Sequence, residues 1–114
     1  MIPRILVIDD EERMCWALER ALSHEGYQVI TATSGLQGIE MALDTEPSTV
    51  ILDLKMPDID GIEVLKKIKS INSNIPVIII TAHGSIETAI EAMKIGATDY
   101  ITKPFNLDEL KVLV

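Results

Sequence analysis

Residues 50–61 read VILDLKMPDIDG, and in this stretch one carboxylate, Asp53, interrupts a run of aliphatic side chains. The run Val50–Leu54 is typical of a strand covered on both faces of a parallel sheet. An ionised carboxylate in such a place costs several kcal/mol of folding free energy unless it has a partner. Asp53 therefore requires a counter-charge, a bound cation or a chemical role, which the rest of the chain must supply.

Similar apolar runs recur along the chain and alternate with stretches of helical periodicity. The strands that we predict are Arg4–Ile8, Gln28–Ala32, Val50–Leu54, Val77–Thr81 and Asp99–Thr102. Strand and helix alternate five times with short connections, which is the pattern of α/β proteins. We therefore predict a doubly wound five-stranded parallel sheet in a single domain, residues 1–114.

Each helical stretch has an apolar stripe that we expect to face the sheet. The stripes are Met14, Ala17, Leu18, Ala21 and Leu22, then Leu36, Ile39 and Leu43, then Val64, Leu65 and Ile68, and finally Ile86, Ala89, Ile90 and Met93. Trp16 and Ile95 lie away from these stripes, so we expect both side chains to be exposed. The last helix, 107–114, is truncated and ends on apolar residues. We therefore expect an N-terminal fragment of a longer protein.

The composition narrows the class of protein. The formal net charge is −8 at pH 7, and nucleic acids are bound mainly through Lys and Arg contacts with phosphates, so we expect no direct nucleic acid contact. No apolar run approaches the roughly 18 residues that span a bilayer, and the N-terminus lacks a secretory pattern. The single cysteine, Cys15, cannot form an internal disulfide. We expect a cytoplasmic domain without membrane contact.

Polar side chains gather where the predicted strands end. Asp9 and Asp10 follow the first strand, Asp53 and Thr81 end the third and fourth, and Lys103 follows the fifth. In doubly wound sheets, ligands bind at the carboxyl ends of the strands. Helix capping alone can account for Asp9 and Asp10. It accounts for neither Asp53 nor Lys103, so we expect one shared site.

Three carboxylates in one cleft indicate a cation. Two unit charges 4 Å apart repel by roughly 4 kcal/mol at an effective dielectric constant near 20. Mg²⁺ removes this repulsion, binds through one or two carboxylates and accepts phosphate oxygens as further ligands. Lys103 supplies a compact positive charge for a phosphoryl oxygen. Asp53 is then placed as a nucleophile that accepts a phosphoryl group.

Four motifs, in this order and spacing, resemble the receiver domain of two-component response regulators. They are VIDD (7–10), LDLKMPDIDG (52–61), TAHG (81–84) and DYITKPF (99–105). The resemblance covers the whole chain and implies the strand order 2-1-3-4-5 of a flavodoxin-like (βα)5 fold, an order for which the chemotaxis receiver is a known example. Residues 81–105 also resemble the NtrC-type transcription activators, in which the receiver precedes an ATPase domain and a DNA-binding domain.

The resemblance implies a metal and phosphoryl site. Asp53 would accept a phosphoryl group from the phosphohistidine of a sensor histidine kinase. Asp10 and Asp53 would bind Mg²⁺ together with the backbone carbonyl of Lys55, and Asp9 would contribute through a water molecule. Lys103 would contact the phosphoryl oxygens.

The resemblance also implies a switch. Thr81 would hydrogen-bond the phosphoryl group, Tyr100 would turn inward as Thr81 moves, and the Lys103–Pro104 bond would be cis. Lys55 and His83 are candidates for tuning the lifetime of the acyl phosphate. Phosphorylation would then change the surface of the fourth helix and fifth strand.

The partners implied are a sensor kinase and output domains that regulate transcription. A homodimer through the fourth helix, fifth strand and fifth helix (residues 86–114) is a further expectation. The first helix of receivers helps to dock the kinase, which makes the exposed Trp16 a candidate contact.

Other readings of the same residues stay open. A Mg²⁺-dependent phosphatase with an aspartyl-phosphate intermediate also uses an Asp nucleophile. Such enzymes have an Asp-x-Asp motif after the first strand, whereas Asp9 and Asp10 are adjacent. A flavin-binding module would need a phosphate-binding loop after the first strand, where this chain is acidic. A purely protein-binding pseudo-receiver would not need Asp53 or Lys103. We expect a signalling domain rather than an enzyme, one that at most catalyses its own phosphorylation and dephosphorylation.

Overall fold

The computed structural model describes residues 2–82 and 85–114. Its strands are β1 (Arg4–Ile8), β2 (Gln28–Ala32), β3 (Thr49–Asp53), β4 (Val77–Thr81) and β5 (Asp99–Thr102). They form one sheet in the order β2-β1-β3-β4-β5, and all neighbouring strands are parallel. The predicted fold class and strand order are therefore confirmed.

The boundaries of β3 differ from the prediction by one residue. Thr49 pairs with Ile5 and so belongs to the ladder, whereas Leu54 lies beyond its end. The Leu54 carbonyl instead accepts the N–H of Gly61 at 3.0 Å. Leu54 therefore belongs to the loop that leads away from Asp53.

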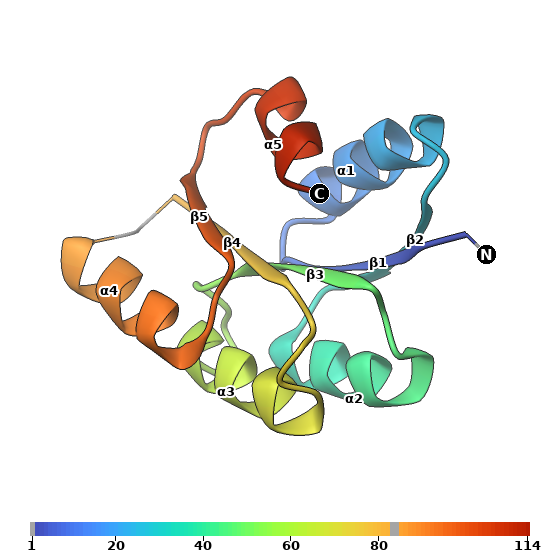
Figure 1. Ribbon diagram of the computed structural model, residues 1–114. Coiled ribbons are helices and arrows are strands. Elements are labelled where there is room, and N and C mark those ends of the chain that lie inside the picture. Colours follow the sequence, from blue (N-terminus) through green and yellow to red (C-terminus); the bar gives the residue numbers. More distant parts are fainter. Residues whose placement is uncertain (1, 83–84) are drawn as a thin grey trace.

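Helices cover both faces of the sheet. They are α1 (Glu12–His24), α2 (Gly35–Thr45), α3 (Gly61–Ile71), α4 (Ile86–Ile95) and α5 (Leu107–Leu113). Figure 1 shows α1 and α5 on one face and α2, α3 and α4 on the other. Within residues 2–82 and 85–114, no helix is both long and apolar enough to cross a membrane.

The sheet separates two hydrophobic cores. Successive side chains of a strand point to opposite faces, so Leu6 and Ile8 pack in the core below α2, α3 and α4. Ile5 and Val7 pack in the core below α1 and α5. This double burial explains why the strands are nearly continuous in apolar residues.

The predicted inner face of α4 is wrong. Ile86, Ile90 and Met93 are 80%, 50% and 46% exposed, whereas Ala92 is fully buried. Ile95, which we expected to be exposed, is partly buried and packs against the core. The helix turns its small Ala92 inward because a small side chain allows close packing on the layer beneath it. The larger stripe consequently faces outward.

The predicted inner face of α2 is only partly correct, because Ile39 packs against the core as predicted but the two leucines do not. Leu36 and Leu43 are about 60% exposed, and the buried positions are Gly35, Gly38 and Ala42. A Cβ atom at Gly38 would lie 2.5 Å from the Cδ1 atom of Ile8. The helix therefore packs too closely on β1 to place a larger side chain there.

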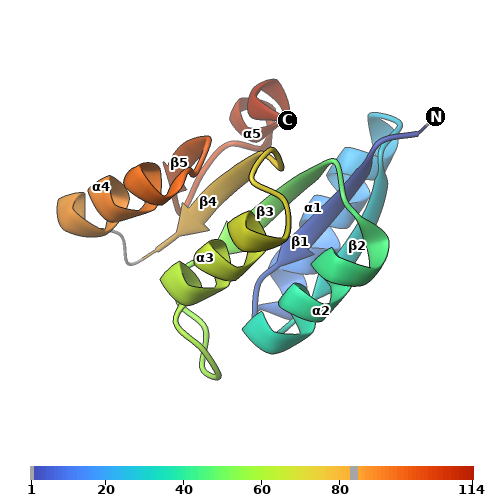
Figure 2. The ribbon, with the colours of Figure 1, turned by 60° about the horizontal axis from the view of Figure 1, so that its bottom comes forward.

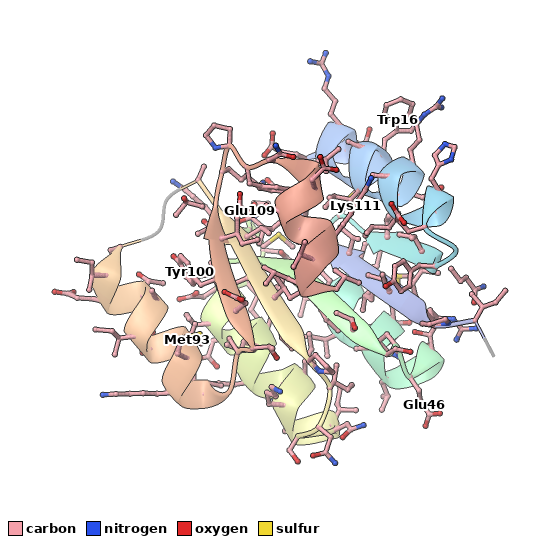
Figure 3. The ribbon with its side chains drawn as sticks, turned by 45° about the horizontal axis from the view of Figure 1, so that its top comes forward. Trp16, Glu46, Met93, Tyr100, Glu109 and Lys111 are labelled. Atoms are coloured by element: carbon pink, nitrogen blue, oxygen red, sulfur yellow. The ribbon has the colours of Figure 1, made fainter. Side chains whose placement is uncertain are left out.

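Trp16 is exposed, as predicted. Its side chain lies on the outer surface of α1 (Figure 3), and the residue is 64% exposed. The guanidinium carbon of Arg20 lies 5.4 Å from the centre of the Trp16 ring, within the range of a cation–π contact.

Gly61 closes the loop after β3 and gives a first testable prediction. A Cβ atom there would overlap the Leu54 Cα atom and would lie 2.5 Å from the Leu54 carbonyl oxygen. Because the backbone cannot yield cheaply, Gly61→Ala is expected to lower the free energy of unfolding by about 1–3 kcal/mol. Urea denaturation measures this change.

Ser70→Ala provides the control, because Ser70 is exposed on the same helix. It should change the free energy of unfolding by no more than about 0.5 kcal/mol. If Gly61→Ala costs no more than Ser70→Ala, the described closure of the loop is incorrect.

Candidate functional site

Lys103 lies at the centre of the polar cluster. Its Nζ atom donates to Asp9 Oδ2 at 2.8 Å and to Asp53 Oδ2 at 3.0 Å. It also donates to Glu11 Oε1 at 3.0 Å. The side chain of Lys103 is only 8% exposed. Because β1, β3 and β5 are parallel, their carboxyl ends bring these residues from distant parts of the sequence to one edge of the sheet.

Asp53 is buried, with 4% of its surface exposed. Its Oδ1 atom accepts the backbone N–H of Lys55 at 3.0 Å, and its Oδ2 atom accepts from Lys103. Both carboxylate oxygens therefore have a partner, and one partner carries a positive charge. This pairing is how the protein tolerates an Asp at the end of an apolar strand.

Asp9 is fully buried beside Asp53. Its Oδ1 atom accepts the backbone N–H of Glu11 at 2.9 Å. Burial raises the pKa of Asp9 above its ordinary value of 3.8, against the opposing effect of the hydrogen bonds from Lys103 and Glu11. The hydrogen bonds from Lys103 and Glu11 therefore compensate the ionised form of Asp9 only in part.

Lys103 keeps its charge in this setting. Burial by itself lowers the pKa of Lys103, but the hydrogen bonds to Asp9, Glu11 and Asp53 outweigh burial and hold the pKa above its ordinary value of 10.5. The ammonium group is thus a permanent positive charge at neutral pH. It is one cation among several carboxylates.

The raised pKa of Asp9 predicts a pH dependence of stability. The folded protein holds the Asp9 proton more tightly than the unfolded chain does. This contribution to stability is complete at low pH and is lost as the pH rises from 3.8 through the folded-state pKa. Asn cannot ionise, so Asp9→Asn should lose less stability than the wild type between about pH 4 and pH 7.

Thermal unfolding in buffer with a chelator measures this difference. The wild type and Asp9→Asn are compared at each pH. Parallel curves for the two proteins would show that Asp9 does not titrate as described.

Asp10 completes an acidic cluster. One carboxylate oxygen from each of Asp9, Asp10 and Asp53 lies within 4.8 Å of the others, and Asp10 is exposed. A cleft of about 270 Å³ opens over the cluster, lined by Asp10, Glu11, Asp53, Lys55, Ala82 and Lys103. Counting Glu11, the carboxylates of the cluster and the cleft outnumber the ammonium groups of Lys55 and Lys103. Hard oxygen ligands and excess negative charge suit a divalent cation such as Mg²⁺.

Thr81 and Tyr100 lie next to this cluster. Thr81 ends β4 and is 1% exposed. Its carbonyl accepts the backbone N–H of Lys103 at 2.9 Å, which fixes the point where the chain leaves β5. The Lys103–Pro104 bond is cis, as the resemblance implied.

Tyr100 lies on β5, on the side of the sheet that faces α4 (Figure 3). Its hydroxyl group is buried and has no hydrogen-bond partner among the residues that the structure describes. Burial raises the pKa of Tyr100 above its ordinary value of 10.0, and the charge of Asp53 adds to this effect. A buried hydroxyl without a partner among the described residues costs free energy.

The structure adds two contacts that the sequence patterns did not identify. Glu11, which the sequence presented only as an acidic residue at a helix start, binds Lys103. The Sγ atom of Cys15 donates to the Asp9 carbonyl at 3.2 Å. No spacing rule distinguishes these residues from their neighbours. Of the two residues proposed to tune the acyl phosphate, Lys55 lines the cleft and His83 lies outside the described residues.

Comparisons with known proteins agree with this geometry. The family model described as "Response regulator receiver domain" matches residues 5–114. Regulatory protein AtoC of Escherichia coli K12 is 41% identical over 113 residues, which are 99% of this chain and 24% of AtoC. The chain thus spans about a quarter of that relative.

Two solved structures are also similar. NtrX from Brucella abortus has a TM-score of 0.91 and 36% identity, and the match covers 99% of this chain and 26% of that one. A response regulator from Burkholderia pseudomallei, solved with a phosphorylated aspartic acid, calcium ion and citrate, has a TM-score of 0.91 and 27% identity, covering 96% and 65%. AtoC and NtrX agree with the resemblance to NtrC-type activators. The chain belongs to the response regulator receiver domain family.

Proposed function

We propose that this domain is a phosphorylation-dependent switch of a cytoplasmic two-component regulator. Asp53 accepts a phosphoryl group from the phosphohistidine of a sensor histidine kinase in the presence of Mg²⁺. The observation that supports this most strongly is the position of Lys103 Nζ, within 3.0 Å of both Asp9 and Asp53 and beside Asp10. This arrangement combines a nucleophile, a phosphoryl-binding cation and ligands for a metal.

Each residue of the site has a separate role in the proposed phosphoryl transfer. An Asp53 carboxylate oxygen attacks the phosphorus atom, and the phosphorus–nitrogen bond breaks with its electron pair remaining on the imidazole of the donor. Lys103 donates to the phosphoryl oxygens. Asp10, Asp53 and the Lys55 carbonyl would hold Mg²⁺, and Asp9 would contribute through a water molecule. Bound Mg²⁺ neutralises charge on the attacking and transferred oxygens.

The same event provides a signal. A phosphoryl group adds about −1.5 to −2 charge at pH 7 and strong acceptor oxygens. Thr81 donates its hydroxyl to one of these oxygens, and Tyr100, whose hydroxyl is already buried in the described structure, changes position as Thr81 moves. The equilibrium of α4 and β5 shifts as a result.

The surface that reports this shift is the exposed stripe of α4. Ile86, Ile90 and Met93 form an apolar row in which each residue is at least 46% exposed. This row forms part of the surface of α4, β5 and α5 through which the domain forms a homodimer and contacts the output domains. Transcription regulation is the output, in keeping with the name of another similar protein, transcriptional regulatory protein ZraR of Klebsiella oxytoca, which is 44% identical over 108 residues. Trp16 on α1 contacts the kinase.

A small phosphodonor tests this function without the kinase. The domain is incubated with acetyl phosphate, with and without Mg²⁺, and its intact mass is measured. A single phosphoryl group that is added only with Mg²⁺ supports the receiver function. Sustained hydrolysis of phosphate esters would instead favour the aspartyl-phosphate phosphatase, and absence of any adduct would contradict the proposal.

A further inference from the structure

The N-terminus of α2 is neutralised by a residue from another part of the chain. The first turn of α2, which the structure describes in full, contains no acidic residue. Ser34 accepts the N–H of Gln37 at 3.2 Å. The N–H groups of Gly35 and Leu36 instead donate to the two carboxylate oxygens of Asp58, each at 3.0 Å.

The contact between the Asp58 carboxylate and these two N–H groups is favoured by electrostatics. A carboxylate at a helix N-terminus is stabilised by the helix dipole and by the N–H groups that point at it. The N–H groups of Leu36 and Gly35 accordingly lower the pKa of Asp58, although its side chain is exposed. Because both oxygens are engaged, the contact fixes the orientation of Asp58 as well as its position.

Asp58 belongs to the loop between Asp53 and α3. Figure 2 shows this loop extending beyond the carboxyl ends of the strands, where the site lies. The loop begins with the Lys55 N–H bond to Asp53 and ends with the Gly61 N–H bond to Leu54. Between these two anchors, Asp58 ties the loop sideways to α2.

Close packing supports the same attachment. A Cβ atom at Gly35 would overlap the Cγ2 atom of Ile59, the residue next to Asp58. Ile59 is also packed against the core. The start of α2 and the middle of the loop are therefore in direct contact, and a glycine is required where they meet.

We propose that Asp58 is a positioning residue for the phosphorylation site. By holding the loop against α2, it sets the direction of the Lys55 backbone and, through the Lys55 N–H, the orientation of the Asp53 carboxylate. Asp58 itself neither contacts Lys103 nor belongs to the acidic cluster in the described structure. This inference rests on the proposed function, because it concerns how that site is held ready for Mg²⁺ and phosphoryl transfer.

The test compares Asp58→Ala with Ser34→Ala. Both substitutions remove hydrogen bonds from the first turn of α2, but only the first releases the loop. Three quantities are measured: the amide resonance of Lys55 in the metal-free protein, the thermal midpoint, and the Mg²⁺ dissociation constant from amide shifts. Asp58→Asn is added because it keeps one acceptor oxygen while removing the charge.

We expect both alanine variants to lower the thermal midpoint. Only Asp58→Ala should shift the Lys55 resonance and raise the Mg²⁺ dissociation constant, by about three- to tenfold. This is less than the about 10–100-fold typical of residues that bond a metal ligand directly. Asp58→Asn should fall between Asp58→Ala and the wild type.

Equal effects of Asp58→Ala and Ser34→Ala on Mg²⁺ binding would overturn the inference, as would an unchanged Lys55 resonance in Asp58→Ala. Either result would leave the proposed function intact if the wild type binds Mg²⁺. A wild-type domain that binds no Mg²⁺ would instead refute the proposed function and this inference with it. The two failures are therefore distinguishable.

Discussion

Asp53→Asn is expected to abolish the gain of a phosphoryl group from acetyl phosphate and Mg²⁺. Asn retains an oxygen that can accept the Lys55 N–H, so the fold and the loop should survive. It lacks the anionic oxygen that attacks phosphorus. Intact mass spectrometry under conditions that phosphorylate the wild type measures the effect.

Asp44→Asn is the matched control. Asp44 is an exposed acidic residue on α2 and does not belong to the acidic cluster. This variant should be phosphorylated like the wild type. An Asp53→Asn variant that still gains a stable phosphoryl group would move the acceptor to another residue.

Lys103→Met is expected to destabilise the metal-free protein by about 3–5 kcal/mol, the cost of breaking a buried ion pair by removing one partner. The reason is that Asp9 and Asp53, whose side chains are 0% and 6% exposed, lose their shared counter-charge. Mg²⁺ should restore part of this loss, because it supplies charge to the same carboxylates. Urea denaturation with a chelator and with Mg²⁺ measures both effects.

Lys66→Met tests whether the loss of an exposed ion pair lowers the free energy of unfolding by a similar amount. Lys66 pairs with Glu63 at 3.3 Å, but both side chains are more than half exposed. Its loss should cost no more than about 1 kcal/mol and should not respond to Mg²⁺. Similar losses in the two variants, or no response of Lys103→Met to Mg²⁺, would mean that the buried cluster is not the source of the effect.

Much of the site could be predicted because it depends on topology. In a parallel sheet, the ends of β1, β3 and β5 must meet at one edge, so Asp9, Asp53 and Lys103 were expected together. Their distances in the structure agree with that expectation. The roles of these residues as metal ligand, acceptor and phosphoryl contact stay proposals.

The sides of α2 and α4 that face the sheet were predicted less accurately than the site. Periodicity shows that a helix has an apolar stripe, but α4 has a second candidate face through Ala92 and Ile95. The sequence pattern ranks large apolar side chains above small ones, whereas the space available on the sheet selects Ala92 in α4 and Gly38 in α2. This is why the row that contains Ile90 is exposed.

Sequence patterns also could not predict which distant segments of the chain are in contact. Asp58 and Gly35 are separated by 23 positions, and nothing in the residue types of the β3–α3 loop indicates which helix it touches. Glu11 likewise has the same chemistry as Glu12 beside it. Only the three-dimensional path of the chain assigns Glu11 to Lys103 and Asp58 to α2.

A crystal structure of the domain with Mg²⁺ and beryllium fluoride, a mimic of the phosphoryl group, would test the central claim most directly. We predict that the mimic is bonded to an Asp53 carboxylate oxygen, with Lys103 donating to it and Mg²⁺ bound by Asp10 and Asp53. A cation bound away from Asp10 and Asp53, or a mimic attached to any other carboxylate, would contradict the account.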